Sequence, residues 1–244
     1  MIVRYDGTLA GLLTVCGRVA SGSLPEPEGI QRPPYPDAGL FDAVVPVEAD
    51  SATAAQLCAR VCRDISPRSF GYLRQAFLSE QPGIELSISR YLAFGWKVGA
   101  QLDCHLAQAD VHAVHCWARR TAHEAHRLQG LARFRETADG TWYAPVRPDA
   151  NVVPLLARHF ARRLDRPWLL HDVGRGIGAL GRDGRFVLGT LECRDEMRWS
   201  AEEESWQRLW RGFHRHIAIP ERASRCRQRR FMPVKYWEYL VEMG

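Results

Sequence analysis

VHAVHCWARRTAHEAHRLQGLARFRETADGTWYAPVRP, residues Val111–Pro148, is the stretch that decides the predicted fold. At about 100° per residue, its first part places apolar and small side chains on one side of a helix. Gly130 suits the backbone position just past a helix end. The opposite side of the helix carries mainly imidazole and guanidinium groups: His112, His115, Cys116, Arg119, His123, His126 and Arg127. The pattern predicts a long helix with one packed face and one basic face.

The sequence after Gly130 predicts a β-hairpin. Asp139-Gly140 stands between two runs of aromatic and β-branched residues, a pattern typical of a tight turn between antiparallel strands. Arg133 and Arg135 are two residues apart on the first strand and therefore share one of its faces. Arg127 ends the basic helix beside them. We expect these three arginines to form a surface that faces phosphate.

The positive charge of the chain is almost entirely arginine. The net charge is +5, and Lys97 and Lys235 are the only lysines. Arginine binds phosphate in bidentate fashion and stacks on bases. A coding bias towards GC would explain the arginine content as a whole equally well, so only the clustering of arginines is informative.

The composition places the chain among ordinary globular proteins of the cytoplasm. The sequence contains no run of about eighteen apolar residues, which is the length needed to cross a membrane. The first residues lack the charged, apolar and small-residue segments that make up a signal peptide. The seven cysteines are an odd number without a CxxC pair, which suits reduced thiols. We expect a cytoplasmic protein that does not contact a membrane.

The order of predicted elements indicates an α+β fold. A helix at about 9–20 belongs to the N-terminal part of the chain. Helices at about 53–64 and 84–98, with another begun by Ser66-Pro67, make a helical block together with the basic helix. The order β-β-α-β-β-β follows and predicts an antiparallel sheet with a helix on one face. A helical tail ends the chain. We expect one domain with four subdivisions: 1–50, 51–130, 131–195 and 196–244.

The C-terminal tail combines basic and aromatic residues. Between Ser205 and Lys235, Glu221 is the only acid. The residues we expect to grip a nucleic-acid strand are Arg222, Arg225, Arg227, Arg229, Arg230, Lys235, Tyr236 and Trp237. Guanidinium groups bind phosphate, and rings stack on unpaired bases. The alternatives are a solvated face of an arginine-rich protein and aromatic rings that dock on their own core.

The sequence motifs that would indicate a metal or cofactor site are incomplete. His112, His115 and Cys116 could share a zinc ion with His105 or Cys104. However, the His123–His126 pair is one residue short of the HExxH spacing, and we predict no metal. Cys58 and Cys62 lack the third cysteine of an iron–sulfur loop, and the glycines at 174–178 lack GxGxxG spacing. We predict no cofactor.

Four residues are candidates for acid–base chemistry. Glu124 lies two residues from His126, His159 lies on a basic helix, and Asp172 follows a histidine at the end of a strand. None has a recognisable nucleophile near it in the sequence. A histidine or carboxylate held in a structural hydrogen bond is the competing interpretation for each.

Four segments together resemble a known family: Tyr5–Thr8 with its following glycine and leucines, Glu124–Glu136, Ala157–Arg163 and Met232–Trp237. The chain is similar over nearly its whole length to a bacterial family described as DNA metabolism or DNA repair proteins with a domain of unknown function, number 4130. Members are typically encoded beside a radical-SAM protein similar to spore photoproduct lyase. Some are fused to a uracil-DNA glycosylase domain.

The resemblance implies a role in DNA repair. It implies a radical-SAM protein as a partner, and a uracil-DNA glycosylase as a second candidate partner. It transfers no catalytic residue. This chain lacks the CxxxCxxC cluster loop of the supposed partner, so any radical chemistry would belong to that partner.

Three hypotheses follow from the sequence. The first is an accessory protein that binds single-stranded or damaged DNA through its arginines. The second is an enzyme that acts on a nucleic-acid lesion with Glu124, His126, His159 or Asp172 as acid or base. The third is an interaction module that buries Trp237 and Tyr239 against the radical-SAM partner without touching nucleic acid.

Overall fold

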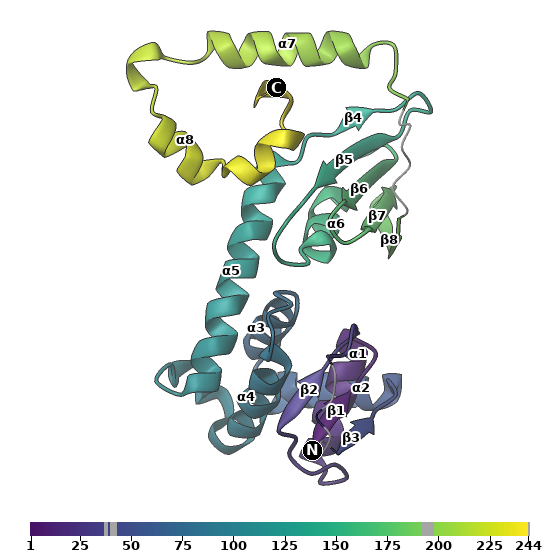
Figure 1. The fold of residues 1–244 in the computed structure, drawn as a ribbon, viewed down its shortest axis with the longest axis vertical. Helices are drawn as coiled ribbons and strands as arrows, with labels where there is room; N and C mark the ends of the chain where they lie inside the picture. The colour runs from purple at the N-terminus through teal and green to yellow at the C-terminus, as the bar shows by residue number, and fades with distance from the viewer. Residues whose placement is uncertain (37–38, 40–42, 192–197, 244) are drawn as a thin grey trace. The chain divides into compact units, whose positions relative to one another are not determined.

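The computed structural model describes residues 1–36, 39, 43–191 and 198–243, and it divides into two compact units. Unit 1 is Met1–Ala122 and unit 2 is His123–Gly244. The boundary lies inside the long helix α5, Ala109–Leu131 (Figure 1). The predicted stop at Gly130 is wrong in detail, because Gly130 is itself helical, has no positive φ, and is followed by one more helical residue. The predicted four subdivisions of one domain stay a prediction.

Unit 1 contains a small parallel sheet. The strands β1 (Ile2–Arg4), β2 (Gly29–Gln31) and β3 (Val44–Pro46) are arranged in the order β2-β1-β3, with β1 parallel to both neighbours. Helix α1, Leu9–Ala20, connects β1 to β2. The Thr8 side chain begins this helix by accepting a hydrogen bond from the backbone of Gly11 at 3.0 Å.

The rest of unit 1 is the predicted helical block. It consists of α2 (Ser51–Asp64), α3 (Pro67–Phe77), α4 (Ile84–Val98), the 3₁₀ helix η1 (Gly99–Cys104) and the first part of α5. Ser66 caps α3 with Pro67 in its first turn, as the sequence predicts. The apolar faces of these helices are buried, with Leu73, Ile88 and Val114 completely inaccessible.

Unit 2 contains the predicted order of two strands, a helix and three strands. The elements are β4 (Arg135–Glu136), β5 (Trp142–Val146), α6 (Val153–Ala161), β6 (Trp168–Asp172), β7 (Ile177–Arg182) and β8 (Arg185–Thr190), and the sheet follows chain order from β4 to β8. The prediction of an antiparallel sheet is wrong at one place, because β5 and β6 are parallel. Helix α6 returns the chain to the edge where β5 began, so β6 runs in the same direction. The chain is therefore mixed α and β, with one parallel and one mixed sheet.

Two aspartate–glycine turns join strands of this sheet and differ in detail. Asp183-Gly184 is a two-residue turn in which both residues have positive φ, 51° and 75°. Asp139-Gly140 also lies in a hairpin turn, but five residues, 137–141, separate β4 from β5. The Asp139 carboxylate stabilises this longer turn by accepting hydrogen bonds from the Thr137 hydroxyl and from the backbone N–H of Thr141.

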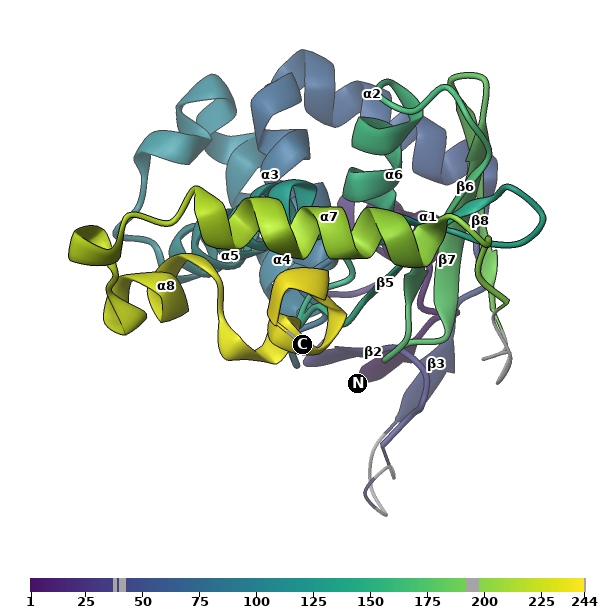
Figure 2. The same cartoon turned by 90° about the horizontal axis from the view of Figure 1, so that it is seen from above.

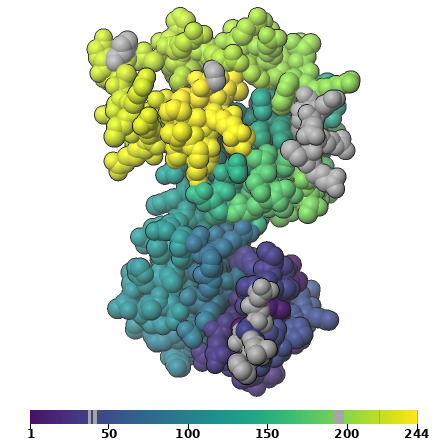
Figure 3. All heavy atoms as spheres, viewed as in Figure 1, coloured from purple at the N-terminus to yellow at the C-terminus, as the bar shows by residue number. Residues whose placement is uncertain are grey.

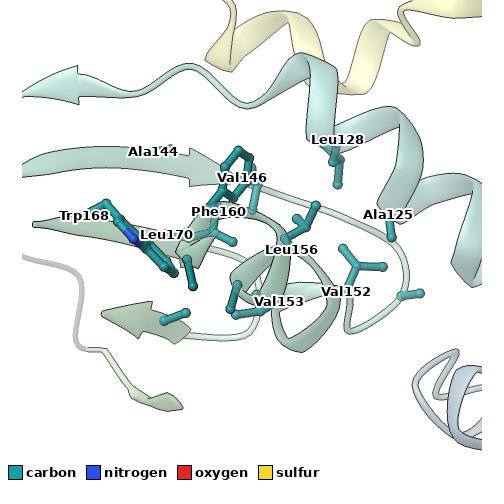
Figure 4. Close-up of a cluster of buried hydrophobic side chains, with 14 of the residues drawn as sticks. Ala125, Leu128, Ala144, Val146, Val152, Val153, Leu156, Phe160, Trp168 and Leu170 are labelled. Carbon is teal, nitrogen blue, oxygen red and sulfur yellow. The ribbon is translucent and has the colours of Figure 1, made fainter. Parts of the chain in front are cut away.

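The core of unit 2 lies between the sheet, α6 and the end of α5. Figure 4 shows Leu128 of α5, Leu156 and Phe160 of α6, and Trp168 and Leu170 of the sheet converging on one cluster. Trp168 is completely buried. The apolar side of α5 therefore packs in the way its periodicity predicts.

The C-terminal part of unit 2 is helical. It contains α7 (Glu203–His216), η2 (Pro220–Arg222), α8 (Arg225–Phe231), η3 (Val234–Tyr239) and η4 (Val241–Met243). Figures 1 and 2 both place α7 beside the last turns of the chain. No helix within the described residues is both long and apolar enough to span a membrane.

Gly181 should be intolerant of a side chain. It pairs with Trp168 across β6 and β7, and a Cβ at Gly181 would lie 2.1 Å from the Trp168 ring. We expect Gly181→Ala to displace the indole and destabilise the fold by about 1–3 kcal/mol, measured by urea denaturation. Gly189→Ala on β8, where nothing lies within 4 Å, is the control. Equal stability of the two variants would contradict this packing.

Candidate nucleic-acid interface

Glu124 is the carboxylate that joins three segments of unit 2. Its two oxygens accept hydrogen bonds from the backbone N–H groups of Asp149 and Ala150 at 2.9 and 2.8 Å. Lys235 and Tyr236 donate to the same carboxylate at 2.8 and 2.6 Å. The end of α5, the loop before α6 and the C-terminal segment therefore meet at one side chain.

These contacts keep Glu124 ionised. Burial raises the pKa of Glu124, but the hydrogen bonds from Lys235, Tyr236 and the backbone outweigh it, so the pKa lies below its ordinary value. Burial also lowers the pKa of Lys235, whereas its bonds to Asp149 and Glu124 raise it and prevail. A carboxylate held in this way is a structural anion, and it has no proton to donate in acid–base chemistry.

Lys235 and Tyr236 each make contacts with other residues of unit 2. Lys235 pairs with Glu124 and Asp149, and the Tyr236 side chain is buried, with 2 % of its surface exposed. In this structure Tyr236 has no ring face to offer a base, which differs from the stacking role predicted for it. Trp237 is half-buried and donates to the Met232 carbonyl oxygen at 2.8 Å.

The three arginines of the predicted phosphate surface lie in different surroundings. Arg133 forms an ion pair with Glu242 at 2.6 Å and donates to the Gly130 carbonyl oxygen. Arg135 is half-buried and stacks over the Trp199 ring at 4.3 Å. Arg127 is exposed and has no partner among the described residues. The middle of the chain and its tail do meet, but ion pairs neutralise much of the charge where they meet.

The arginines of the tail remain open to solvent. Those on η2 and α8 are exposed and form no ion pair within the part of the chain that the structure describes: Arg222, Arg225, Arg227, Arg229 and Arg230. Ser224 caps α8 by accepting from the backbone of Arg227 at 3.3 Å. These side chains are free to bind an anion.

A second basic surface lies on α6 and the residues after it. An open pocket of about 420 Å³ is lined by Gln129, Leu155, Arg158, His159, Arg162 and Arg163. The helical spacing of Arg158 and Arg162 puts both on the side that faces away from the Leu156–Phe160 core. None of the three arginines has an acidic partner among the described residues.

His159 takes its electrostatic character from this pocket. Burial lowers the pKa of His159, and the positive charge of Arg163 lowers it further. The imidazole is therefore mainly neutral at pH 7. It can exchange hydrogen bonds with a bound group and adds no charge to that of the arginines.

The other candidates for acid–base chemistry lie apart from one another. His171 is buried against Tyr143, with 2.9 Å between its Nδ1 and the Tyr143 hydroxyl, and burial lowers its pKa. Asp172 is completely buried and pairs with Arg175 at 2.9 Å. His126 is exposed. Within the described residues, no hydrogen bond or ion pair joins any two of Glu124, His126, His159 and Asp172.

The histidines considered for metal binding do not converge either. His115 is buried in unit 1, where its Nε2 lies 2.7 Å from Asp103, and its ring stacks on Tyr72 at 4.2 Å. His112 is exposed, and Cys116 is half-buried. Across residues 1–36, 39, 43–191 and 198–243, no three histidine, cysteine or acidic side chains are placed to hold a metal ion.

The family described as a domain of unknown function, DUF4130, matches residues 82–242. The chain belongs to the DUF4130 family. No match is found among curated proteins or among solved structures. The DUF4130 match includes the Glu124 contacts, the basic pocket on α6 and the C-terminal helices.

Part of this DUF4130 surface had a sequence signal that the predicted site omitted. The run from Arg158 to Arg163 contains three arginines and no acid, on a helix whose other side is apolar. This pattern of clustered arginines on one side of an amphipathic helix, and not the arginine content alone, predicts a basic surface at the position of the pocket. The ion pairs of Arg133 and Lys235 had no such signal, because their acidic partners Glu242, Glu124 and Asp149 lie 109, 111 and 86 residues away along the chain.

The Glu124 contacts should make the stability of the protein sensitive to acid. The pKa of Glu124 is lower in the folded chain than its ordinary value of 4.5, so its contribution is complete above that pH. It is lost as pH falls towards the lower, folded pKa. We expect Glu124→Gln to cost about 1.5–3 kcal/mol at pH 7 and to flatten the acid limb of a stability curve from urea denaturation.

The exposed Glu221→Gln is the control for this measurement, because Glu221 has no partner among the described residues. An acid limb as steep in Glu124→Gln as in the unaltered protein would show that another carboxylate governs it.

Proposed function

We propose that the chain is a DNA-binding accessory protein of DNA repair, which holds the phosphodiester backbone in the basic pocket on α6. The observation that supports this most is the set of three arginines, Arg158, Arg162 and Arg163, lining one open pocket without an acidic partner in the described part of the chain. Uncompensated guanidinium groups repel one another. A ligand with negative charge relieves that repulsion.

The shape of the pocket favours a polymer backbone over a small anion. The pocket of about 420 Å³ is open to solvent, and its arginines are exposed. Each guanidinium can donate two parallel hydrogen bonds to one phosphate. Binding would release counterions from the DNA, so affinity should fall steeply with salt.

The exposed arginines of η2 and α8, together with Arg127, supply further phosphate contacts in this proposal. These contacts carry no sequence information, and they would hold single-stranded or damaged DNA of any sequence. The role in repair, the radical-SAM partner and the possible uracil-DNA glycosylase partner come from the family resemblance. We include them in the proposal on that ground alone.

The pocket arginines should control the salt dependence of DNA binding. We expect the variant with Arg158, Arg162 and Arg163 changed to alanine to bind a labelled single-stranded oligonucleotide more weakly, measured by fluorescence anisotropy. Loss of three phosphate contacts should flatten the slope of log K against log salt by about 2. The side chains are on the surface of the helix, so the fold should persist.

The matched control removes the same charge elsewhere. Arg60, Arg63 and Arg90 in unit 1 lie beside acids, with Arg60 and Arg63 paired to Asp64. Changing these three to alanine should leave the slope unchanged. If both triple variants weakened binding equally, net charge and not the pocket would be responsible.

The α8 surface is tested separately. Arg229→Ala combined with Arg230→Ala should weaken binding to all sequences alike and flatten the salt slope by about 1.4 for single strands. Competition between two unrelated oligonucleotides checks the sequence independence. A loss confined to one sequence would mean that these arginines contact bases.

A further inference from the structure

A second cleft in unit 2 differs from the basic pocket in chemistry. It lies between the segment that leads into β4 and helix α7, and its volume is about 270 Å³. The side chains that determine its character are Arg133, Arg135, Glu203, Trp206, Gln207 and Trp210. Pockets for drug-sized ligands hold roughly 300–1,000 Å³, so this cleft suits one planar ring system.

Arg135 has a buried polar atom in this cleft without a hydrogen-bond acceptor in the part of the chain that the structure describes. Its Nε is inaccessible to solvent, and within the described residues it has no hydrogen-bond acceptor. Burial lowers the pKa of Arg135, yet a guanidinium stays protonated in a protein. A buried donor without an acceptor is energetically unfavourable. The Arg135 side chain as a whole is half-buried and lines the cleft, so its guanidinium is placed to donate to carbonyl or ring-nitrogen acceptors of a ligand.

The charges that line the cleft nearly cancel. Arg133 is paired with Glu242. Burial lowers the pKa of Arg135, and the negative charge of Glu203 in the same cleft partly offsets this effect. A phosphate gains little from such surroundings, whereas the pocket on α6 has only positive groups. The cleft therefore suits a neutral ligand with polar edges.

The aromatic rings provide the faces for such a ligand. Arg133 stacks over the Trp210 ring at 5.5 Å, and the Trp210 indole N–H donates to Glu242 at 3.0 Å. Trp206 has no such contact among the described residues, and 60 % of it is exposed. One ring of the cleft is thus fixed in place while the other is open.

Helix α7 is oriented in an unusual way that keeps Trp206 open. Its polar residue Glu203 is buried and accepts a hydrogen bond from the Glu136 backbone at 2.9 Å. Its apolar residues Leu209 and Phe213 are 63 % and 55 % exposed. Figure 3 shows the atoms of α7 packed against those of the C-terminal segment on this side of unit 2. The buried contact of α7 with β4 is therefore made by a polar residue, whereas the apolar side chains of the helix, Trp206 among them, are exposed to solvent.

From these observations we infer that the cleft between β4 and α7 binds an unpaired nucleobase of single-stranded DNA. The base stacks on Trp206, and its acceptor edge faces Arg135. This inference rests on the proposed function, because the basic pocket would hold the backbone of the same strand. Stacking on an aromatic side chain tolerates any base, since every base has a π face.

The test compares a thymidine oligonucleotide with an abasic oligonucleotide of the same length and backbone. We expect the unaltered protein to bind the thymidine strand roughly tenfold more tightly, because only that strand can stack. Trp206→Ala and Arg135→Gln should bring the ratio of the two affinities close to one. Trp206→Phe should restore much of it. Trp117→Ala, at a half-buried tryptophan with Arg120 over its ring in unit 1, is the control.

The outcomes separate this inference from the proposed function. Equal binding of both strands by the unaltered protein would overturn the base cleft and leave backbone binding in place. A ratio unchanged in Trp206→Ala would also overturn it. Failure to bind either strand would overturn both. Dimerisation of the free protein that Trp206→Ala abolishes would assign the exposed rings to a protein interface and overturn the base cleft.

Discussion

The contacts of Glu124 are the constraint on which the arrangement of unit 2 depends. One carboxylate accepts from two backbone N–H groups before α6 and from two side chains of the C-terminal segment. A buried anion is stable only when its lone pairs are satisfied, because burial without partners would force it to take up a proton. The loop, the tail and α5 must therefore stay together for the carboxylate to remain ionised. This coupling fixes where α6 begins and where the last helical turns lie.

The division of the arginines into two groups follows from that arrangement. Docking of the tail brings Glu242 to Arg133 and Asp149 to Lys235, so these cations are used to hold the fold. The arginines of α6 and α8 lie where no acid of the described chain reaches them. Surface ion pairs add little stability by themselves, so their main effect here is on which positive charges remain available. In unit 2 the arginines on α6, after it and on α8 therefore keep their positive charge uncompensated by the described residues.

Two neighbouring functions of a strand-binding protein, backbone binding and base stacking, need opposite electrostatics. A backbone site requires uncompensated positive charge, whereas a base site requires aromatic faces and a balanced set of polar groups. The pocket on α6 has the first character, and the cleft between β4 and α7 has the second. In our proposals the two sites bind different parts of one ligand. Of the acid–base candidates, Glu124 and Asp172 each accept hydrogen bonds from structural partners.

The sequence by itself determined the elements whose signals are local. The bounds of α1, α3 and α4, the apolar side of α5 and the turn at Asp183-Gly184 follow from periodicity, caps and turn residues, which act within a few positions. The basic side of α6 was visible for the same reason. Only the tertiary structure decided the parallel pairing of β5 with β6, the burial of Tyr236 and the neutralisation of Arg133 and Lys235. Those features depend on groups far apart in the chain, and a charge pattern read along the sequence does not show which acid will lie beside which arginine.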